Sequence, residues 1–169
     1  WALTNYSTAN ALRGIHFIDA DTGIIVGFSG TILRSKDGGT TWTTIASGTT
    51  QPLRSVYFSS HDTGYICGGA GTMLKTVNSG ITWTAQSTGI TTDLINVRFA
   101  TNDVGYSVAS SGSFTTGAVI KTTNGGSTWT TVYSDALIGY LGVAVIDENT
   151  VYAGGGNQNI VKTTDGGTT

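Results

Sequence analysis

Carboxylates are the side chains of this 169-residue chain best suited to acid–base chemistry, and there are ten of them. A glycoside hydrolase needs two carboxyl groups that face each other across about 5 to 9.5 Å. Five of the ten recur at equivalent turn positions: Asp21, Asp37, Asp62, Asp103 and Asp165. The others lie beside predicted turns or strand ends: Asp19, Asp93, Asp135, Asp147 and Glu148. Because the sequence does not single out two carboxylates that would face each other in this way, we predict that the chain is not an enzyme and assign no catalytic residue.

Metal and cofactor chemistry has little support in the sequence. The two histidines, His16 and His61, have no Cys, His or Asp partners at ligand spacing. Cys67 lies in the apolar run Tyr65-Ile66-Cys67, so it is predicted to be a buried core residue. The glycines of 154–156 do not lie between a strand and a helix, as those of a phosphate-binding loop do. We therefore predict no metal site and no cofactor.

The elements that position these side chains belong to a repeat marked by tryptophan. Trp1, Trp42 and Trp83 are 41 residues apart, and Trp129 follows 46 residues later. A turn with Asp or Asn and glycine recurs in segments 35–42, 76–83, 122–129 and 163–169. Its acidic or amide residues are Asp37, Asn78, Asn124 and Asp165. Such side chains accept hydrogen bonds from backbone N–H groups, and each tryptophan is predicted to pack between neighbouring sheets.

Each repeat is predicted to form four short strands. Apolar residues alternate, as in Ile15/Phe17 and Val56/Phe58, and turn residues recur about every ten positions. Four antiparallel strands in about 40 to 50 residues are typical of a propeller blade. We therefore predict an all-β chain, a β-propeller of four tandem four-stranded antiparallel blades. The predicted blades span about 12–47, 53–88, 94–134, and 140–169 together with 1–7.

One candidate ligand site falls on the predicted inner strands, which line the central channel of a propeller. The candidates share two repeat positions, with Arg13 and Arg54 at the first and His16, Tyr57 and Arg98 at the second. These side chains could form a polar ring that captures an anionic or protein ligand. The alternative is that they are solvated strand ends, since Ile95 and Leu141 replace the arginine in the other two repeats.

The first residues are predicted to form an outermost strand. Segment 1–7 contains Trp1 and precedes 42–48 by one repeat length. We expect this strand to complete the fourth blade, either of its own chain or of a neighbouring chain, because pairing removes exposed sheet edges. Exchange between chains would give a dimeric ring or a head-to-tail filament. The alternative is that the chain is an excerpt of a longer array.

Composition narrows the class of protein. Charged residues make up 11% of the chain and the formal net charge is −2, so a nucleic-acid partner is not predicted. No apolar run approaches the roughly 18 residues of a transmembrane helix. The start of the chain shows no charged region followed by an apolar stretch, so no signal peptide is expected within it.

The repeat resembles known families. The turn segments resemble the Asp-box, or bacterial neuraminidase repeat, with the pattern Ser/Thr-x-Asp/Asn-x-Gly-x-x-Trp. The whole repeat resembles the photosystem II assembly/stability factor family of propellers, through Phe-x-x-x-Asp-x-Gly-Tyr and through segments 30–35 (GTILRS) and 71–76 (GTMLKT). This resemblance implies a propeller fold and a basic surface that helps to bind a partner protein. Asp-boxes also occur in sialidases and xyloglucan-cleaving hydrolases.

We predict a non-enzymatic module that is secreted or at the cell surface. It would act through protein–protein contacts, with a protein partner or with copies of itself. Low charge and much Thr, Ser and Gly are typical of such modules. Two alternatives stay open: a fragment of an Asp-box glycoside hydrolase, and a photosystem assembly chaperone.

Overall fold

The computed structural model describes residues 6, 8–113, 116–156 and 159–168. Over these residues the chain forms β-strands and two short 3-10 turns, η1 (Phe28–Gly30) and η2 (Gly69–Gly71). The strands fall into four antiparallel sheets, and within each sheet they follow the order of the chain. This regular order is what tight turns between consecutive strands produce, since each turn joins two hydrogen-bonded neighbours.

Blades 1 to 3 each contain four strands. Blade 1 consists of β1 (Leu12–Phe17), β2 (Gly23–Gly27), β3 (Ile32–Ser35) and β4 (Thr43–Ile45). Blade 2 consists of β5 (Leu53–Phe58), β6 (Gly64–Gly68), β7 (Met73–Thr76) and β8 (Thr84–Gln86). Blade 3 consists of β9 (Asp93–Phe99), β10 (Gly105–Ser110), β11 (Gly117–Thr122) and β12 (Thr130–Asp135).

Blade 4 has three strands within the described residues. They are β13 (Tyr140–Val145), β14 (Val151–Gly155) and β15 (Ile160–Thr163). The strand predicted over 1–7 lies almost entirely outside the described residues. Its described member, Tyr6, lies at blade 1, where its hydroxyl is 3.5 Å from Thr44 Oγ1 of β4.

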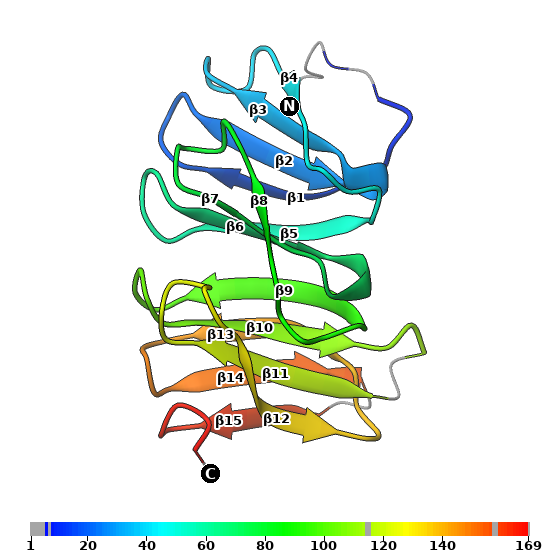
Figure 1. The fold of residues 1–169 in the computed structure, drawn as a ribbon, viewed down its shortest axis with the longest axis vertical. Helices are drawn as coiled ribbons and strands as arrows, with labels where there is room; N and C mark the ends of the chain where they lie inside the picture. The colour runs from blue at the N-terminus through cyan, green and yellow to red at the C-terminus, as the bar shows by residue number, and fades with distance from the viewer. Residues whose placement is uncertain (1–5, 7, 114–115, 157–158, 169) are drawn as a thin grey trace.

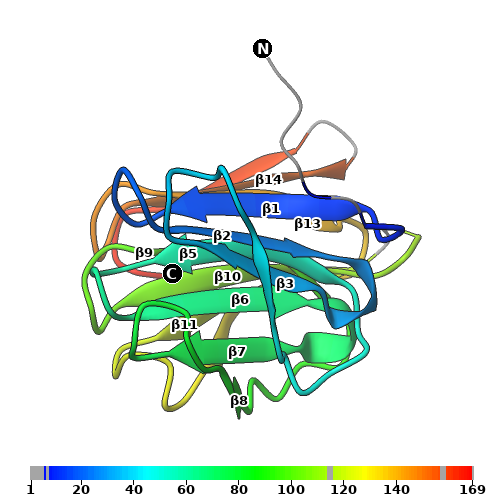
Figure 2. The same ribbon diagram turned by 90° about the horizontal axis from the view of Figure 1, so that it is seen from above.

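The first strands of the blades pack side by side in one row. β1 lies against β5, β5 against β9, and β9 against β13, so β1 and β13 end the row. Figure 1 shows blade 1 at the upper end of the molecule and β15 at the lower end. In Figure 2, the outer strands of blade 2, β7 and β8, lie on the opposite side of the molecule from β1. This is the arrangement expected when blades radiate from an inner row of strands.

The core is divided into three apolar clusters, one between each pair of consecutive blades. In the first, Ile24 and Val26 of β2 meet Phe58 and Trp83 of blade 2. Alternation along each strand sends one set of side chains to the preceding blade and the other set to the following blade. Both faces of an internal blade are therefore apolar, which explains why β6 and β10 are buried throughout.

The Asp-x-Gly turn holds glycine because an aromatic ring covers its backbone. A Cβ atom on Gly64 would lie 2.7 Å from the ring of Phe58, and one on Gly105 would lie 2.6 Å from Phe99. Blade 4 has Val145 at the aromatic position and Val151 at the glycine position. The smaller side chain leaves room for the larger one, so the two positions vary together between repeats.

Candidate functional site

The two repeat-related arginines have different partners. Arg13 on β1 is exposed, and its guanidinium carbon lies 4.8 Å from the ring centroid of Phe28. Arg54 on β5 forms an ion pair with Asp93 on β9. Asp93 also accepts a hydrogen bond from the backbone N–H of Ala70, at 3.1 Å. Arg54 therefore joins blade 2 to blade 3, whereas Arg13 presents its charge to solvent.

His16, Tyr57 and Arg98 lie on consecutive inner strands, and we call them the inner row. The ring centroids of His16 and Tyr57 are 5.7 Å apart, with the planes inclined by 67°. The guanidinium carbon of Arg98 lies 5.5 Å from the Tyr57 centroid. The Tyr57 hydroxyl donates a hydrogen bond to the Phe99 carbonyl at 3.2 Å. The structure thus brings the three predicted residues together across three blades.

The side chains of the inner row are half-buried, and the row carries a positive charge. Burial, and then the positive charge of Arg98, lowers the pKa of His16 below its usual value. His16 is therefore neutral at neutral pH, and the permanent charge of the row comes from Arg98. A guanidinium over an aromatic face offers directed N–H donors and a flat apolar surface. These groups can hold a carboxylate, a backbone carbonyl or an aromatic side chain.

Sequence reasoning missed Asp93 as the partner of Arg54. The carboxylate lies 39 residues after the arginine and at the start of the following blade. Asp93 does not recur in the repeat: the equivalent residue one repeat earlier is Pro52. The pairing therefore left no recurrent pattern that the sequence could reveal.

The four Asp/Asn turns have a common hydrogen-bond pattern, and we call segments 37–39, 78–80, 124–126 and 165–167 the glycine turns. In the first, Asp37 Oδ1 accepts hydrogen bonds from the Ser35 hydroxyl at 2.8 Å and from the Thr41 backbone N–H at 2.9 Å. Asn78 and Asn124 accept the corresponding bonds in the second and third turns. Asp165 Oδ1 accepts from the Thr163 hydroxyl and from the Thr168 backbone N–H, which is three residues on and not four.

The tryptophans that follow the glycine turns pack against neighbouring rings and turns. The indole N–H groups of Trp42 and Trp83 donate to the carbonyls of Gly39 and Gly80, at 3.0 and 3.2 Å. Trp129 packs edge-on against Phe99, with ring centroids 6.0 Å apart. Trp1 lies outside the described residues.

His61 lies in a separate exposed cluster of turns. Its ring nitrogens are 3.0 Å from the Asp62 carboxylate and 3.3 Å from the Asp19 carboxylate. Hydrogen bonds to Asp62 and then to Asp19 raise the pKa of His61. Within the described ranges, no three His, Cys, Asp or Glu side chains are placed to hold a metal ion. Nor do these ranges contain a helix of the length and apolarity needed to span a membrane.

Residues 1–137 match the model of a protein family described as photosynthesis system II assembly factor YCF48. The chain belongs to this family. No curated protein sequence matches the chain. The predicted resemblance to the photosystem II assembly factor family is therefore confirmed.

Solved structures of low sequence identity share the fold. One, described as YCF48 bound to D1 peptide, aligns with a TM-score of 0.62 and 16% identity over 96% of this chain and 82% of that chain. The WD40 β-propeller domain of Doa1 aligns with a TM-score of 0.69 and 18% identity over 95% of this chain and 54% of that one. The predicted β-propeller architecture is thus confirmed.

The GH74 xyloglucanase from Xanthomonas campestris aligns with a TM-score of 0.72 and 14% identity. The alignment covers 93% of this chain and 28% of the enzyme, so the chain spans less than a third of its length. At this identity the likeness concerns the fold alone, because propellers with similar blades host unrelated activities.

Proposed function

We propose that this YCF48-family chain is a non-enzymatic module that binds an extended segment of a partner protein on its inner strands. The observation that carries the proposal is the inner row, in which His16, Tyr57 and Arg98 combine aromatic faces with one permanent positive charge. Extended peptides offer backbone carbonyls and side chains at regular spacing, which suits a row of groups on successive strands.

The proposed ligand carries a negative charge or a chain-terminal carboxylate. Arg13 is exposed at one end of the inner strands, and Arg98 lies in the row itself. Guanidinium groups recognise carboxylates with two parallel hydrogen bonds. The solved relative described as bound to D1 peptide supports a peptide as the ligand class.

We further propose that the module acts outside the cell or at its surface. The low charge content, 11% of residues, and the abundance of Thr, Ser and Gly support this proposal. Fractionation of cells that express the full-length gene product, followed by protease treatment of intact cells, would test it. Resistance to protease in intact cells, with cleavage after lysis, would contradict it.

Binding of labelled peptides, measured by fluorescence anisotropy, tests the proposed function. The probes are a D1 peptide and an acidic peptide of the same length, each with an amidated counterpart. We expect Arg98→Ala to weaken binding by about ten- to a hundredfold, since a charge-assisted hydrogen bond is worth about 1.5 to 3 kcal/mol. The matched control is Lys36→Ala, which removes an exposed charge beside the first glycine turn and outside the inner row.

Two outcomes would contradict the proposal. Equal loss of affinity in Arg98→Ala and Lys36→Ala would indicate a diffuse charge effect and no site on the inner row. Release of sugar from xyloglucan by the purified chain would favour the glycoside hydrolase alternative. Preference for the D1 peptide over the acidic peptide would favour a role in photosystem assembly.

A further inference from the structure

The glycine turn of blade 2 differs from the other three at its middle position. Ser79 stands there, whereas blades 1, 3 and 4 have Gly38, Gly125 and Gly166. Ser79 adopts a φ of 55°, in the left-handed region that favours glycine. A side chain in this region destabilises the backbone, and it persists where its contacts offset that cost. The contacts of Ser79 therefore point to a role that glycine could not fill.

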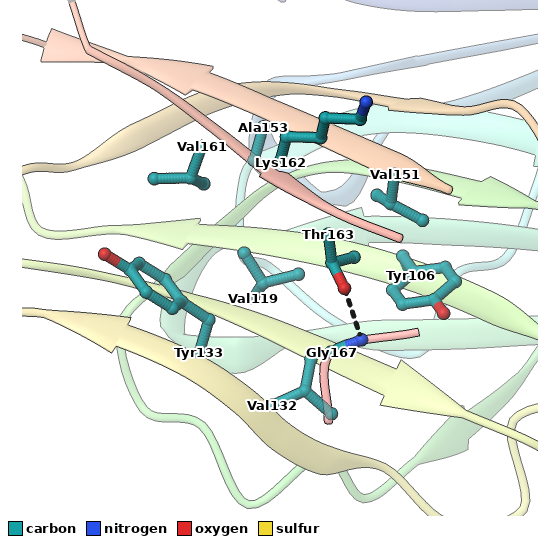
Figure 3. Close-up of a pocket in the computed structure, with 10 residues that line it drawn as sticks. All are labelled: Tyr106, Val119, Val132, Tyr133, Val151, Ala153, Val161, Lys162, Thr163 and Gly167. Carbon is teal, nitrogen blue, oxygen red and sulfur yellow. Dashed lines mark hydrogen bonds between the residues drawn. The ribbon is translucent and has the colours of Figure 1, made fainter. Parts of the chain in front are cut away.

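The hydrogen bond that closes this turn is the usual one. Figure 3, which is centred on the cavity between blades 3 and 4, shows its equivalent in blade 4, from the Gly167 N–H to Thr163 Oγ1 at 2.9 Å. In blade 2 the bond runs from the Gly80 N–H to Thr76 Oγ1 at 3.1 Å. The serine is thus added to a turn of normal geometry.

Ser79 is held by blade 1 on one side and by its own blade on the other. Its carbonyl accepts a hydrogen bond from Nε of Arg34, on β3 of blade 1, at 2.9 Å. Its hydroxyl donates to Oδ1 of Asp62, in the turn between β5 and β6, at 2.7 Å. The backbone carbonyl of Asp62 also accepts the Ser79 N–H at 3.0 Å. The serine hydroxyl therefore fixes the orientation of the Asp62 carboxylate.

His61 lies between two carboxylates that come from different blades. Its Nδ1 is 3.0 Å from Asp62 Oδ1 of blade 2, and its Nε2 is 3.3 Å from Asp19 Oδ2 of blade 1. The equivalents of His61 in blades 1, 3 and 4 are Ala20, Asn102 and Glu148. The histidine, like the serine, is a feature of blade 2 and not of the repeat.

The Asp19 carboxylate is oriented by its own turn. Its Oδ1 accepts hydrogen bonds from the backbone N–H groups of Asp21 and Thr22, at 2.9 and 2.6 Å. These bonds hold the carboxylate within the turn between β1 and β2, so that Oδ2 faces His61. Both acceptors of the histidine are therefore fixed by other contacts, one in each blade.

The protonated form of His61 suits both contacts, whereas the neutral form suits one. A neutral imidazole has a single N–H, so one ring nitrogen would direct its lone pair at a carboxylate oxygen. An imidazolium donates from both nitrogens, one to each blade. Backbone hydrogen bonds, the largest from Thr22, lower the pKa of Asp19. Hydrogen bonds from His61 and then Ser79 lower the pKa of Asp62, so both acceptors are charged at neutral pH.

We propose that His61 is a pH-sensitive clasp between blades 1 and 2, closed when its imidazole is protonated and open when it is neutral. The closed clasp completes a circuit of contacts. The circuit runs from Arg34 of blade 1 to Ser79, Asp62 and His61 of blade 2, and back to Asp19 of blade 1.

The clasp should be strongest in mild acid. Hydrogen bonds to Asp62 and then to Asp19 raise the pKa of His61 from 6.5. The stability from a raised histidine pKa is complete below pH 6.5 and is lost as the pH rises through the raised value. The stability from the two lowered carboxyl pKa values is complete above pH 3.8 and is lost in stronger acid. All three charges are therefore present between pH 3.8 and 6.5.

His16 lies at the same junction and titrates separately. It stacks on Phe58 of β5, with ring centroids 5.5 Å apart, and Arg98 is the charged group that acts on it. Its lowered pKa affects wild type and His61 variants alike, so it cancels when the two are compared. The clasp is tested without a peptide ligand, so its failure would not count against the proposed peptide binding.

The first test is the equilibrium constant of unfolding in urea, followed by far-UV circular dichroism at about pH 5.5 and about pH 8.5, on either side of the His61 titration. We expect His61→Gln to raise this constant about two- to fivefold at the lower pH, the range for an exposed ion pair. At the higher pH the variant should match wild type, because the clasp is already open.

The second test is the NMR titration of the His61 Cε1–H proton, which reports the charge of the ring in the folded protein. We expect a midpoint above 6.5 in wild type and a lower midpoint in Asp19→Asn. The matched control is Asp147→Asn. Asp147 accepts the same two backbone hydrogen bonds in blade 4, from Asn149 and Thr150 at 2.8 and 2.7 Å, so its loss should leave the His61 midpoint unchanged.

Three results would overturn the proposal. A loss of stability in His61→Gln that is equal at both pH values would mean that the ring acts by packing and not by charge. A His61 midpoint that Asp19→Asn leaves unchanged, or that Asp147→Asn lowers equally, would mean that blade 1 makes no specific contact. A wild-type midpoint at or below 6.5 would mean that the two carboxylates do not hold the imidazolium.

Discussion

At the scale of single residues, the glycine turns show that one geometry can be built from a charged or a neutral side chain. Asp37 accepts a hydrogen bond from the Thr41 hydroxyl at 2.6 Å. In the second turn the direction is reversed, because Asn78 Nδ2 donates to the Thr82 hydroxyl at 2.8 Å. A hydroxyl can take either role, so Asp and Asn interchange at this position without loss of the turn.

The stability of a glycine turn with Asp should be sensitive to acid, whereas that of a turn with Asn should not. Hydrogen bonds from Thr41 and then Ser35 lower the pKa of Asp37 from 3.8 to about 2. A lowered carboxyl pKa gives stability that is complete above pH 3.8 and is lost as the pH falls through about 2. We expect Asp37→Asn to reduce the acid-induced drop in the thermal unfolding midpoint over this range and to change it little at pH 7.

Asp21→Asn is the matched control for this measurement. Asp21 is also an exposed turn residue, but it supports the glycine turn through its backbone carbonyl, which accepts the Gly38 N–H at 3.0 Å. If both variants flatten the acid transition equally, the effect belongs to net charge and not to the Asp37 hydrogen bonds.

At the scale of elements, the unit of stability is the junction between two blades. Trp83 is 9% exposed because blade 1 covers it, whereas Trp42 is half-buried beside the segment around Tyr6 and Thr8. The sequence predicts the same role for both tryptophans. The structure shows that their surroundings differ, because a residue in the blade at the end of the row has fewer neighbours than the equivalent residue in an internal blade.

Replacing the two tryptophans should therefore have unequal effects. We expect Trp83→Ala to lower the free energy of unfolding by about 3 to 5 kcal/mol, the range for large-to-small changes at a packed site. Trp42→Ala should cost clearly less, because part of its ring is already in water. Denaturant unfolding followed by far-UV circular dichroism measures both values. Equal losses would mean that the end position is as tightly packed as the internal one.

The sequence was sufficient to predict the strands, the turns and their order, because these depend on contacts close in the chain that recur in every repeat. It also grouped His16, Tyr57 and Arg98 correctly, since equivalent positions on neighbouring inner strands must lie side by side. It did not reveal the ion pair of Arg54 with Asp93. That contact joins two different repeat positions, so it depends on which residues happen to face each other across a junction.

At the scale of the whole molecule, the described residues form a row of blades in which the main contacts between sheets join consecutive blades. The stability of such proteins is close to a sum over units and junctions. Blades 2 and 3 each have two junctions, and the cluster between them contains Cys67, which is fully buried. An internal junction cannot open without the separation of blades that are held on their other sides as well.

Cys67 provides a probe for this cooperativity. Burial raises the pKa of its thiol to about 12, so the reactive thiolate is suppressed in the folded chain. We expect Cys67 to react with a thiol reagent only through global unfolding. The dependence of its labelling rate on denaturant should then match the slope of global unfolding measured by circular dichroism.

Ala136→Cys serves as the control, because it adds a thiol in an exposed loop that should react at once in the native protein. Rapid labelling of Cys67 without denaturant would show that blades 2 and 3 separate in the native state. A shallow dependence on denaturant would indicate local opening of the junction while the other blades stay folded. Either result would mean that the row of blades is only weakly coupled, with each junction opening on its own.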